Sequence, residues 1–395
     1  MNIIIVGAGP AGMVTAIKAK NKNNRVILIE KNDRIGKKLL ATGNGRCNYT
    51  NLNLSCKNYS NGDFVKETLE EFNNEDLINF FKVLGLESTT DGNRVYPITL
   101  KANTVLNMLM YWLDKKNVEI MTSTEVKSFH KVRDEFVVET NNGDFKCDKL
   151  VCAFGANSMP SSGSDGTAFK ILREHGHSIT ELFPALTQLK LDSKYLKHLS
   201  GVKVIGEVKL LRGEEVIDRR RGDLLFTNYG ISGPPILDLS VNARKNDIIE
   251  VPLINNIDKN IKDMLYSRFY MFQDFSLEYF LMGLVDKKFI HYIVDNLDLD
   301  KNLAISSLNI KDFDKIVNLL LSSRFVVTGN TGFKNSQVTR GGVSLNEVNS
   351  SDYSSKKVKD LYIIGEALDI DGDCGGYNLH FAIACGYRLG LKFSI

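Results

Sequence analysis

The 395-residue chain lacks paired cysteines, long apolar runs and a large net charge. Its six cysteines form no CxxC pair and no Cys/His spacing of a zinc site, so neither a disulfide-stapled miniprotein nor a zinc protein is predicted, and a reducing cytosol is favoured. No run of about 18 apolar residues occurs, and no basic segment precedes the first apolar run, which argues against membrane spanning and secretion. The charge surplus of +3 is too small to predict nucleic acid as a partner by itself.

The composition is otherwise that of a folded, globular protein. Hydrophobic residues make up 43% and charged residues 25% of the chain, which allows a large core. The length predicts two or three domains, at roughly 100 to 200 residues per domain.

The N-terminal segment predicts a strand, a tight turn and a helix. A β-branched run at 3–6 is followed by Gly-Ala-Gly-Pro-Ala-Gly at 7–12 and by a helical pattern at 13–20. A second β-branched run, 25–29, ends on Glu30. A GxGxxG turn between a strand and a helix, with an acidic residue about 20 positions later, is typical of a dinucleotide-binding βαβ unit.

Each residue of this unit has a physical role toward a dinucleotide. Gly7 permits the turn, Gly9 lets the backbone approach a pyrophosphate, and Gly12 allows close helix packing. The helix N-terminus supplies unpaired amides for the phosphates. Glu30 would accept hydrogen bonds from ribose hydroxyls and repel a 2′-phosphate, which favours FAD or NAD over NADP. The alternative for Glu30 is a solvated carboxylate at a strand end.

A second glycine-rich segment near the C-terminus favours a flavin. A buried run at 360–364 leads into Gly365-Glu366-Ala367, and paired glycines at 375–376 precede a helical pattern at 381–389. The first turn can meet ribityl and pyrophosphate groups, and the backbone amides near Asn378 and Leu379 can face the pyrimidine end of the flavin. A structural glycine turn is the alternative.

Changes of pattern along the chain predict an interrupted α/β protein. Short alternating runs from about residue 186 indicate an antiparallel barrel, and the stretch before residue 325 has helical spacing. We therefore expect a Rossmann-type FAD-binding domain formed by 1–185 and 349–395, interrupted by a β-barrel domain at 186–255 and 325–348 and by a helical subdomain at 256–324.

The chain resembles, from end to end, the HI0933-like or BaiN/RdsA-type family of bacterial NAD(P)/FAD-dependent flavoproteins. The resemblance is carried by six ordered segments, at residues 7–12, 36–48, 94–97, 163–166, 222–234 and 365–379. It implies a two-dinucleotide-binding-fold FAD domain with inserted barrel and helical domains, as the sequence patterns also predict. The chain departs from the family pattern at His380, where relatives commonly carry Gln, and at Asn44, where many carry Gly.

Together these segments predict a set of FAD-binding residues. The glycines of 36–48 would wrap the pyrophosphate and ribityl, while Lys38 and Arg46 would offset phosphate charge. The full set is Gly7, Gly9, Pro10, Ala11, Gly12, Glu30, Lys31, Lys38, Thr42, Gly43, Gly45, Arg46, Cys47, Asn48, Val126, Ala153, Gly155, Gly365, Glu366, Asp373, Gly376, Asn378 and Leu379.

Cys47 is the first candidate for a catalytic acid. A thiol with a pKa of about 8.5 can donate a proton at neutral pH, although the neighbouring Arg46 would favour the thiolate. The alternative is a buried cysteine that packs or contacts the cofactor. Tyr96, Tyr377 and His380 are weaker candidates, with aromatic packing as the default for the two tyrosines.

Several other features have plainer interpretations. Arg219-Arg220-Arg221 could meet a phosphate backbone, but a solvated turn is the commoner outcome. His175 and His177 are predicted to cap a helix end. Cys374 has no partner cysteine nearby in sequence, which disfavours a redox-active disulfide.

The predicted function is that of an FAD-dependent oxidoreductase, with the flavin carrying the hydride chemistry. Residues 155–160 give no second GxGxxG, so NAD(P)H would be a transient donor. The resemblance implies reduction of a conjugated C=C bond, with a uridine of 23S ribosomal RNA as the favoured substrate and a steroid-type enone as an alternative. An amine oxidase that forms hydrogen peroxide and a flavin-bearing binding protein are alternatives from other classes.

Overall fold

The computed structural model describes residues 1–255 and 260–395, which form two compact units. Unit 1 comprises Met1–Ala185 and Phe333–Ile395, and unit 2, Leu186–Gly332, is inserted in it. The first boundary is the predicted one. Residues 333–348, assigned above to the barrel, belong instead to unit 1, because β18 (Val338–Arg340) pairs there with β11 (Phe183–Ala185). The predicted start of the helical subdomain at 256 lies outside the described residues.

A five-stranded parallel sheet forms the centre of unit 1, in the order β19-β10-β1-β2-β6. These strands are Leu361–Ile363, Lys149–Cys152, Asn2–Val6, Arg25–Ile29 and Glu119–Met121. Both strands of the predicted N-terminal βαβ unit are present. The late apolar run at 360–364 joins the same sheet, so the two ends of the chain share one core. The predicted Rossmann-type α/β fold is confirmed.

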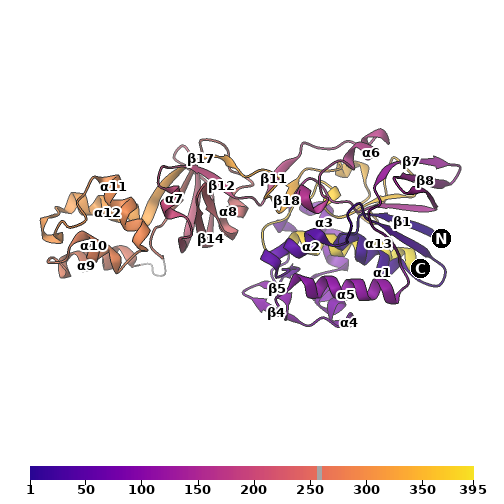
Figure 1. Ribbon diagram of the computed structural model, residues 1–395, viewed down its shortest axis with the longest axis horizontal. Helices are drawn as coiled ribbons and strands as arrows, with labels where there is room; N and C mark the ends of the chain where they lie inside the picture. The colour runs from indigo at the N-terminus through magenta and orange to yellow at the C-terminus, as the bar shows by residue number, and fades with distance from the viewer. Residues whose placement is uncertain (256–259) are drawn as a thin grey trace. The chain divides into compact units, whose positions relative to one another are not determined.

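Helices and a second sheet cover the two faces of this parallel sheet (Figure 1). On one side lie α1 (Pro10–Ala19), α5 (Ala102–Lys115) and α13 (Tyr377–Ser394), and on the other the antiparallel strands β7 (Val126–Val132), β8 (Glu135–Thr140) and β9 (Gly143–Cys147). The helices α1 and α13 cross closely. A Cβ at Gly386 would lie 2.4 Å from the carbonyl oxygen of Ala11, so a glycine is required at this crossing.

A small antiparallel sheet, β3-β5-β4, also belongs to unit 1. Its strands are Thr50–Asn51, Arg94–Pro97 and Ser88–Asp91. Two helices, α3 (Gly62–Glu71) and α4 (Asn74–Val83), follow each other closely, and Asn73 forms the capping box that starts α4. The stretch 31–61 contains α2 (Lys37–Ala41) and β3, and α6 spans Phe169–Glu174.

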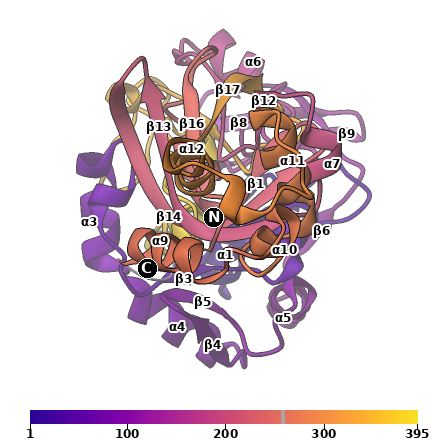
Figure 2. The same ribbon diagram turned by 90° about the vertical axis from the view of Figure 1, so that its left-hand side faces the viewer.

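Unit 2 is built on a closed antiparallel barrel in the order β12-β15-β14-β13-β16-β17. The strands are Leu189–Asp192, Gly230–Ser232, Glu215–Thr227, Lys203–Arg212, Ile248–Val251 and Ser323–Asn330, with α7 (Leu196–Leu199) and α8 (Pro234–Leu239) in the connections. Figure 2 shows the long curved strands β13 and β14. Arg219, Arg220 and Arg221 lie within β14, opposite residues 207–209 of β13, so the prediction of a turn there is wrong. Their neighbours have strand-like alternation that extends the hairpin past them.

The helical part of unit 2 contains α9 (Ile261–Met271), α10 (Leu277–Met282), α11 (Lys287–Leu297) and α12 (Ile310–Ser322). These helices share one hydrophobic core with the barrel strands, in which residues such as Phe280, Phe313 and Phe226 are fully buried. Among the described residues, none of the helices has the length and apolar character needed to cross a bilayer.

Candidate cofactor site

The turn between β1 and α1 has the geometry that a dinucleotide needs. Gly7 has φ +105, and a Cβ there would meet the Ala153 carbonyl oxygen at 2.5 Å. A Cβ at Gly12 would lie 2.0 Å from the carbonyl oxygen of Gly7, so α1 can start only where no side chain intervenes. A Cβ at Gly9, by contrast, would meet nothing within 4 Å. Gly7 and Gly12 are therefore required by the fold, whereas Gly9 faces open space.

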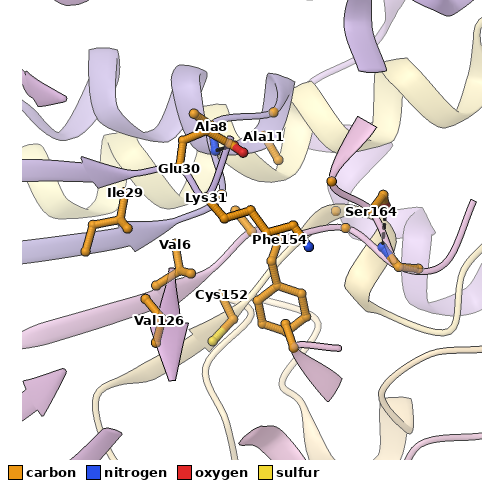
Figure 3. A pocket seen from close by; sticks show the side chains of 18 of the residues that line it. Val6, Ala8, Ala11, Ile29, Glu30, Lys31, Val126, Cys152, Phe154 and Ser164 are labelled. Carbon is orange, nitrogen blue, oxygen red and sulfur yellow. Dashed lines mark hydrogen bonds between the residues drawn. The ribbon is translucent and has the colours of Figure 1, made fainter. Parts of the chain in front are cut away.

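This open space is part of a cavity of about 310 Å³ in unit 1. It lies at the carboxyl ends of the parallel strands, where α/β sheets bind ligands. Figure 3 shows Glu30 and Lys31 approaching it from the end of β2, with Val126 and Phe154 also among its lining side chains. Of the predicted cofactor residues, it is lined by Gly7, Gly9, Pro10, Ala11, Glu30, Lys31, Lys38, Val126, Ala153, Gly155, Gly365 and Glu366.

Glu30 is held in position at the end of β2. Its carboxylate accepts the Ala8 amide at 3.0 Å, and it accepts both the backbone and side-chain N–H groups of Asn32 at 2.9 and 2.7 Å. These bonds orient an acceptor with two oxygens toward the cavity, as recognition of ribose hydroxyls requires. Lys31 is turned to the Asp165 carboxylate, at 2.7 Å.

These features fit the adenosine and pyrophosphate part of FAD. The start of α1 has no capping side chain and no acidic residue in its first turn, so its free amides and positive dipole end are available to phosphates. The open space at Gly9 gives the phosphates room to approach these amides. The cavity is also lined by Gly36, Lys38, Gly365 and Glu366, which belong to the two segments predicted to meet the flavin half.

Lys38 has a different partner from the one predicted. Its ammonium is paired with the Glu366 carboxylate and also donates to the Ser158 hydroxyl. Glu366 in turn accepts the Ser158 hydroxyl at 2.6 Å and the Thr339 amide at 2.9 Å. The charge of Lys38 is therefore offset by Glu366, and this cluster ties α2 to the turn after β19.

The first glycine segment follows α2 in an unusual backbone conformation. Gly43, Asn44 and Gly45 have φ of 56, 55 and 81. The Thr42 hydroxyl donates to the Leu39 carbonyl at 2.6 Å, and the Asn48 side-chain amide donates to backbone carbonyls at 2.9 and 3.0 Å. Thr42 and Asn48 thus fix the backbone of the segment on either side of its glycines.

Arg46 does not reach toward a phosphate in this structure. Its guanidinium stacks on the Tyr96 ring, 4.7 Å from the centroid, and lies 3.6 Å from the Asp91 carboxylate. The predicted role of Arg46 as a phosphate partner needs a different side-chain position.

The interpretation of Cys47 as an acid or a cofactor contact needs correction. Its side chain is fully buried in the main core of unit 1, and burial raises the pKa of the thiol to about 12. The expected effect of Arg46, a stabilised thiolate, is outweighed by desolvation. A thiol with no exposed surface and so high a pKa neither reaches a substrate nor gives up its proton readily. The packing interpretation is the one that the structure supports.

The C-terminal glycine segment is fixed by its own side chains. Asn378 accepts the Gly372 amide at 2.8 Å and donates to the Gly372 carbonyl at 2.7 Å, while Asp373 accepts the Asn58 side-chain amide at 3.0 Å. Gly376 has φ +101 and starts α13, where a Cβ would lie 2.6 Å from the Thr50 carbonyl oxygen. The side chains of Asn378 and Asp373 thus shape the loop, and Leu379 is buried in the first turn of α13.

His380 is also a structural residue, which corrects the catalytic hypothesis. It is fully buried, and burial lowers its pKa to about 4. Its Nε2 lies 3.1 Å from the Phe72 carbonyl oxygen and must donate to it, so Nδ1 accepts the Thr50 hydroxyl at 2.9 Å. A neutral imidazole with both nitrogens engaged has no proton to exchange with a substrate.

The remaining candidates from the sequence have varied surroundings. Tyr96 and Tyr377 are both buried, at 2% and 7% exposure. His175 caps the C-terminus of α6, as predicted, and stacks on Phe129 at 3.9 Å. The His177 backbone also caps α6, since its N–H donates to the Leu172 carbonyl at 3.0 Å, while its side chain is buried, with Ser355 at 2.9 Å and Glu347 at 3.3 Å. A sequence pattern alone could not have shown these tertiary partners.

The sequence analysis did not single out three residues that lie near the glycine segments. Ser158 and Thr339 belong to the Lys38–Glu366 cluster, and Arg94 lies beside Gly375. Arg94 lies in a matched segment, which was a usable signal. Thr339 comes from the stretch that was wrongly assigned to the barrel, so nothing in the sequence pointed to it.

Comparison with known proteins places the chain in a family. The family model described as HI0933-like protein Rossmann domain matches residues 1–392. The chain is 31% identical to the 3-dehydro-bile acid delta(4,6)-reductase of Clostridium scindens, over 98% of this chain and 97% of that protein. It is 30% identical to the ribosomal RNA dihydrouridine synthase of Escherichia coli, over 96% and 94%.

A solved structure shares the fold at low sequence identity. The 3-ketosteroid-delta4-(5alpha)-dehydrogenase of Rhodococcus jostii matches with a TM-score of 0.50 and 12% identity, over 100% of this chain and 96% of that one. The match supports the fold assignment alone. Because the family model spans nearly the whole sequence, the chain belongs to the HI0933-like family, as its six motif segments predict.

Proposed function

We propose that this protein, an FAD-dependent oxidoreductase, uses NAD(P)H to reduce a C=C bond conjugated to a carbonyl group, and that its substrate is a uridine of 23S ribosomal RNA. The main observation in favour of FAD as the cofactor is the cavity at Gly9, which the Glu30 carboxylate also lines. When bound, FAD would supply hydride transfer between the donor and the substrate. The chain's own groups would bind, orient and exclude water.

The roles of the individual residues follow from their positions. The Glu30 carboxylate would accept the ribose hydroxyls, and the first amides of α1 would bind the pyrophosphate. The Lys38–Glu366 pair would border the phosphates without adding net charge. The raised pKa of the Cys47 thiol and the two hydrogen bonds of the His380 ring argue against these residues as proton donors. Tyr96 and Tyr377, which are also buried, are the remaining predicted proton donors to the substrate carbon.

Two features support RNA as the substrate. Relatives in Escherichia coli and Haemophilus influenzae, 30% and 28% identical, carry the name ribosomal RNA dihydrouridine synthase. In unit 2, Arg219 and Arg221 are exposed at alternate positions of β14 and so point to the same side of the barrel. Two guanidinium groups spaced in this way are suited to a phosphate backbone.

The test is an anaerobic assay with an unmodified 23S ribosomal RNA transcript and either NADH or NADPH. We expect dihydrouridine in the RNA by mass spectrometry, together with loss of the nicotinamide absorbance. The Gly9→Val variant, with no room for the pyrophosphate, should form none. An RNA without dihydrouridine under both donors would contradict the RNA proposal. RNA from a deletion strain gives the matching test in cells.

A steroid-type enone is the second candidate, favoured by the whole-length similarity to the bile acid reductase of Clostridium scindens. The same assay with a Δ4-3-keto steroid in place of RNA distinguishes the two. Saturation of the steroid without any change in the RNA would establish this alternative. Peroxide formed only with an amine would identify an amine oxidase, and FAD without turnover in any assay would identify a binding protein.

A further inference from the structure

The strand β5 brings the two glycine segments together on one of its faces. Arg94 and Tyr96 are two positions apart and share a face, while Val95 points to the other and is fully buried. A Cβ at Gly43 would lie 3.6 Å from the Tyr96 ring, and a Cβ at Gly375 would lie 3.7 Å from Nε of Arg94. One face of β5 therefore borders both segments assigned to the flavin half of FAD.

The Arg94 guanidinium sits beside a loop that is held rigidly. Asn51 is directly opposite Arg94 in the β3–β5 ladder, and its side-chain amide donates to the Gly375 carbonyl at 2.9 Å. A Cβ at Gly375, which has φ +136, would lie only 3.2 Å from that amide nitrogen. Asn51 thus fixes the loop just before α13 begins, with Arg94 next to it.

Among the residues that the structure describes, Arg94 has no counter-ion, unlike Arg46 and Arg340. Arg46 has Asp91 and the Tyr96 ring, and Arg340 has a bidentate pair with Asp371 at 3.0 Å. Within 1–255 and 260–395, the side chain of Arg94 makes neither a hydrogen bond nor an ion pair, although it is partly buried. A partly buried cation without a counter-ion is a candidate partner for a negative charge on a bound cofactor.

We propose that Arg94 is the charge partner of the flavin's pyrimidine end, placed to stabilise the negative charge that reduction puts there. The inference rests on the proposed function, since it needs FAD at the two glycine segments. Uptake of two electrons and one proton leaves one negative charge on the ring system. The N-terminus of the 18-residue helix α13 follows Gly375 directly, and its dipole has the same sign as Arg94. Both favour the reduced cofactor over the oxidised one.

The test is the midpoint potential of the bound flavin, measured by equilibration with a redox dye in the absence of any substrate. We compare the wild type with Arg94→Gln, Arg94→Lys and, as a matched control in unit 2, Arg244→Gln, which replaces an exposed arginine. Removing one charge near the ring should lower the reduction equilibrium constant about tenfold, or ~30 mV for a two-electron couple. Arg94→Lys should stay close to the wild type, and Arg244→Gln should match it.

The outcomes separate the two proposals. A wild-type protein without FAD would overturn the proposed function and this inference with it. A wild type that holds FAD, with Arg94→Gln at an unchanged potential, would overturn the inference alone. If Arg94→Gln holds no FAD, the lysine variant decides: FAD at a wild-type potential supports the charge role, and an empty Arg94→Lys protein shows that Arg94 is structural.

Discussion

The two halves of the candidate FAD site differ in how side chains contribute to them. In the nucleotide half, around Gly7 to Gly12 and Glu30, the predicted residues line the cavity except Gly12, which packs α1 against the turn. In the flavin half, Cys47 and His380 are fully buried and serve the core.

This difference has a physical cause. A dinucleotide turn acts through its backbone, and backbone geometry follows from local sequence. A catalytic side chain acts through its exposure and partners, which depend on distant segments such as Phe72 for His380. Local motifs therefore predict the backbone turn at Gly7 to Gly12 well, and predict the burial and the partners of side chains such as His380 poorly.

The largest expected effect separates two glycines of the nucleotide half. Gly12→Val places a Cβ against the Gly7 carbonyl, where only backbone could move, and should lower the free energy of unfolding by about 3 kcal/mol or more. Gly9→Val has open space, so it should fold like the wild type but bind FAD at least about 100-fold more weakly. Urea unfolding of flavin-free protein and flavin titration measure the two. Full FAD loading of Gly9→Val would refute this division of roles.

In the flavin half, His380 should make stability depend on pH. The unfolded state binds a proton below pH 6.5, whereas the folded state keeps the imidazole neutral down to about 4. Lowering the pH through this window therefore favours the unfolded state, by up to about 3 kcal/mol. His380→Gln should lose this part of the pH dependence. Urea unfolding between pH 7 and 4.5 provides the comparison, and parallel curves for the two proteins would argue against a buried neutral histidine.

The Lys38–Glu366 pair lies where the two halves meet. Both side chains are about one-fifth exposed, at 22% and 18%, so removing one leaves the other partly desolvated. Lys38→Met and Glu366→Gln should each cost about 1–3 kcal/mol of unfolding free energy. The double variant should cost less than the sum of the two. Additive costs in this cycle would mean that the pair is not coupled.

The smallest expected effect is on turnover in Cys47→Ala. Because the thiol is buried and its pKa is raised to about 12, its loss should leave kcat within about twofold of the wild type. Stability should fall by about 1 kcal/mol for the lost packing. Steady-state turnover with NAD(P)H and the 23S ribosomal RNA transcript measures kcat. A loss of 100-fold or more with FAD retained would restore the acid role of Cys47.

Much of the fold could be predicted from local pattern. The β-branched run at 3–6, the turn at 7–12 and the run at 360–364 identified one sheet made by both ends of the chain. The boundary after Ala185 could be predicted because short alternating runs of apolar and polar residues begin there. The return of 333–348 to unit 1 could not be predicted, because its short strand β18 pairs with β11, about 150 residues earlier in the sequence.

The sequence could predict which segments form the candidate site, but not which side chains would pair with one another there. The spacing of Glu30 from Gly9 was enough to predict its place in the site. Glu366, the partner of Lys38, is 328 residues away in the sequence. The position of Arg94 beside the loop at Gly375 is likewise visible only in the folded protein. Burial of Cys47 is equally a tertiary property, which no neighbour in sequence discloses.

The most direct measurement is acid release of the flavin from freshly purified protein, with identification by chromatography. We infer that the turn at Gly9, the Glu30 carboxylate and the segment after Gly365 serve a single dinucleotide. We expect a yellow protein whose noncovalently bound FAD is released in equimolar amount with the chain. Release of FMN, or of no flavin after reconstitution with excess FAD, would contradict it.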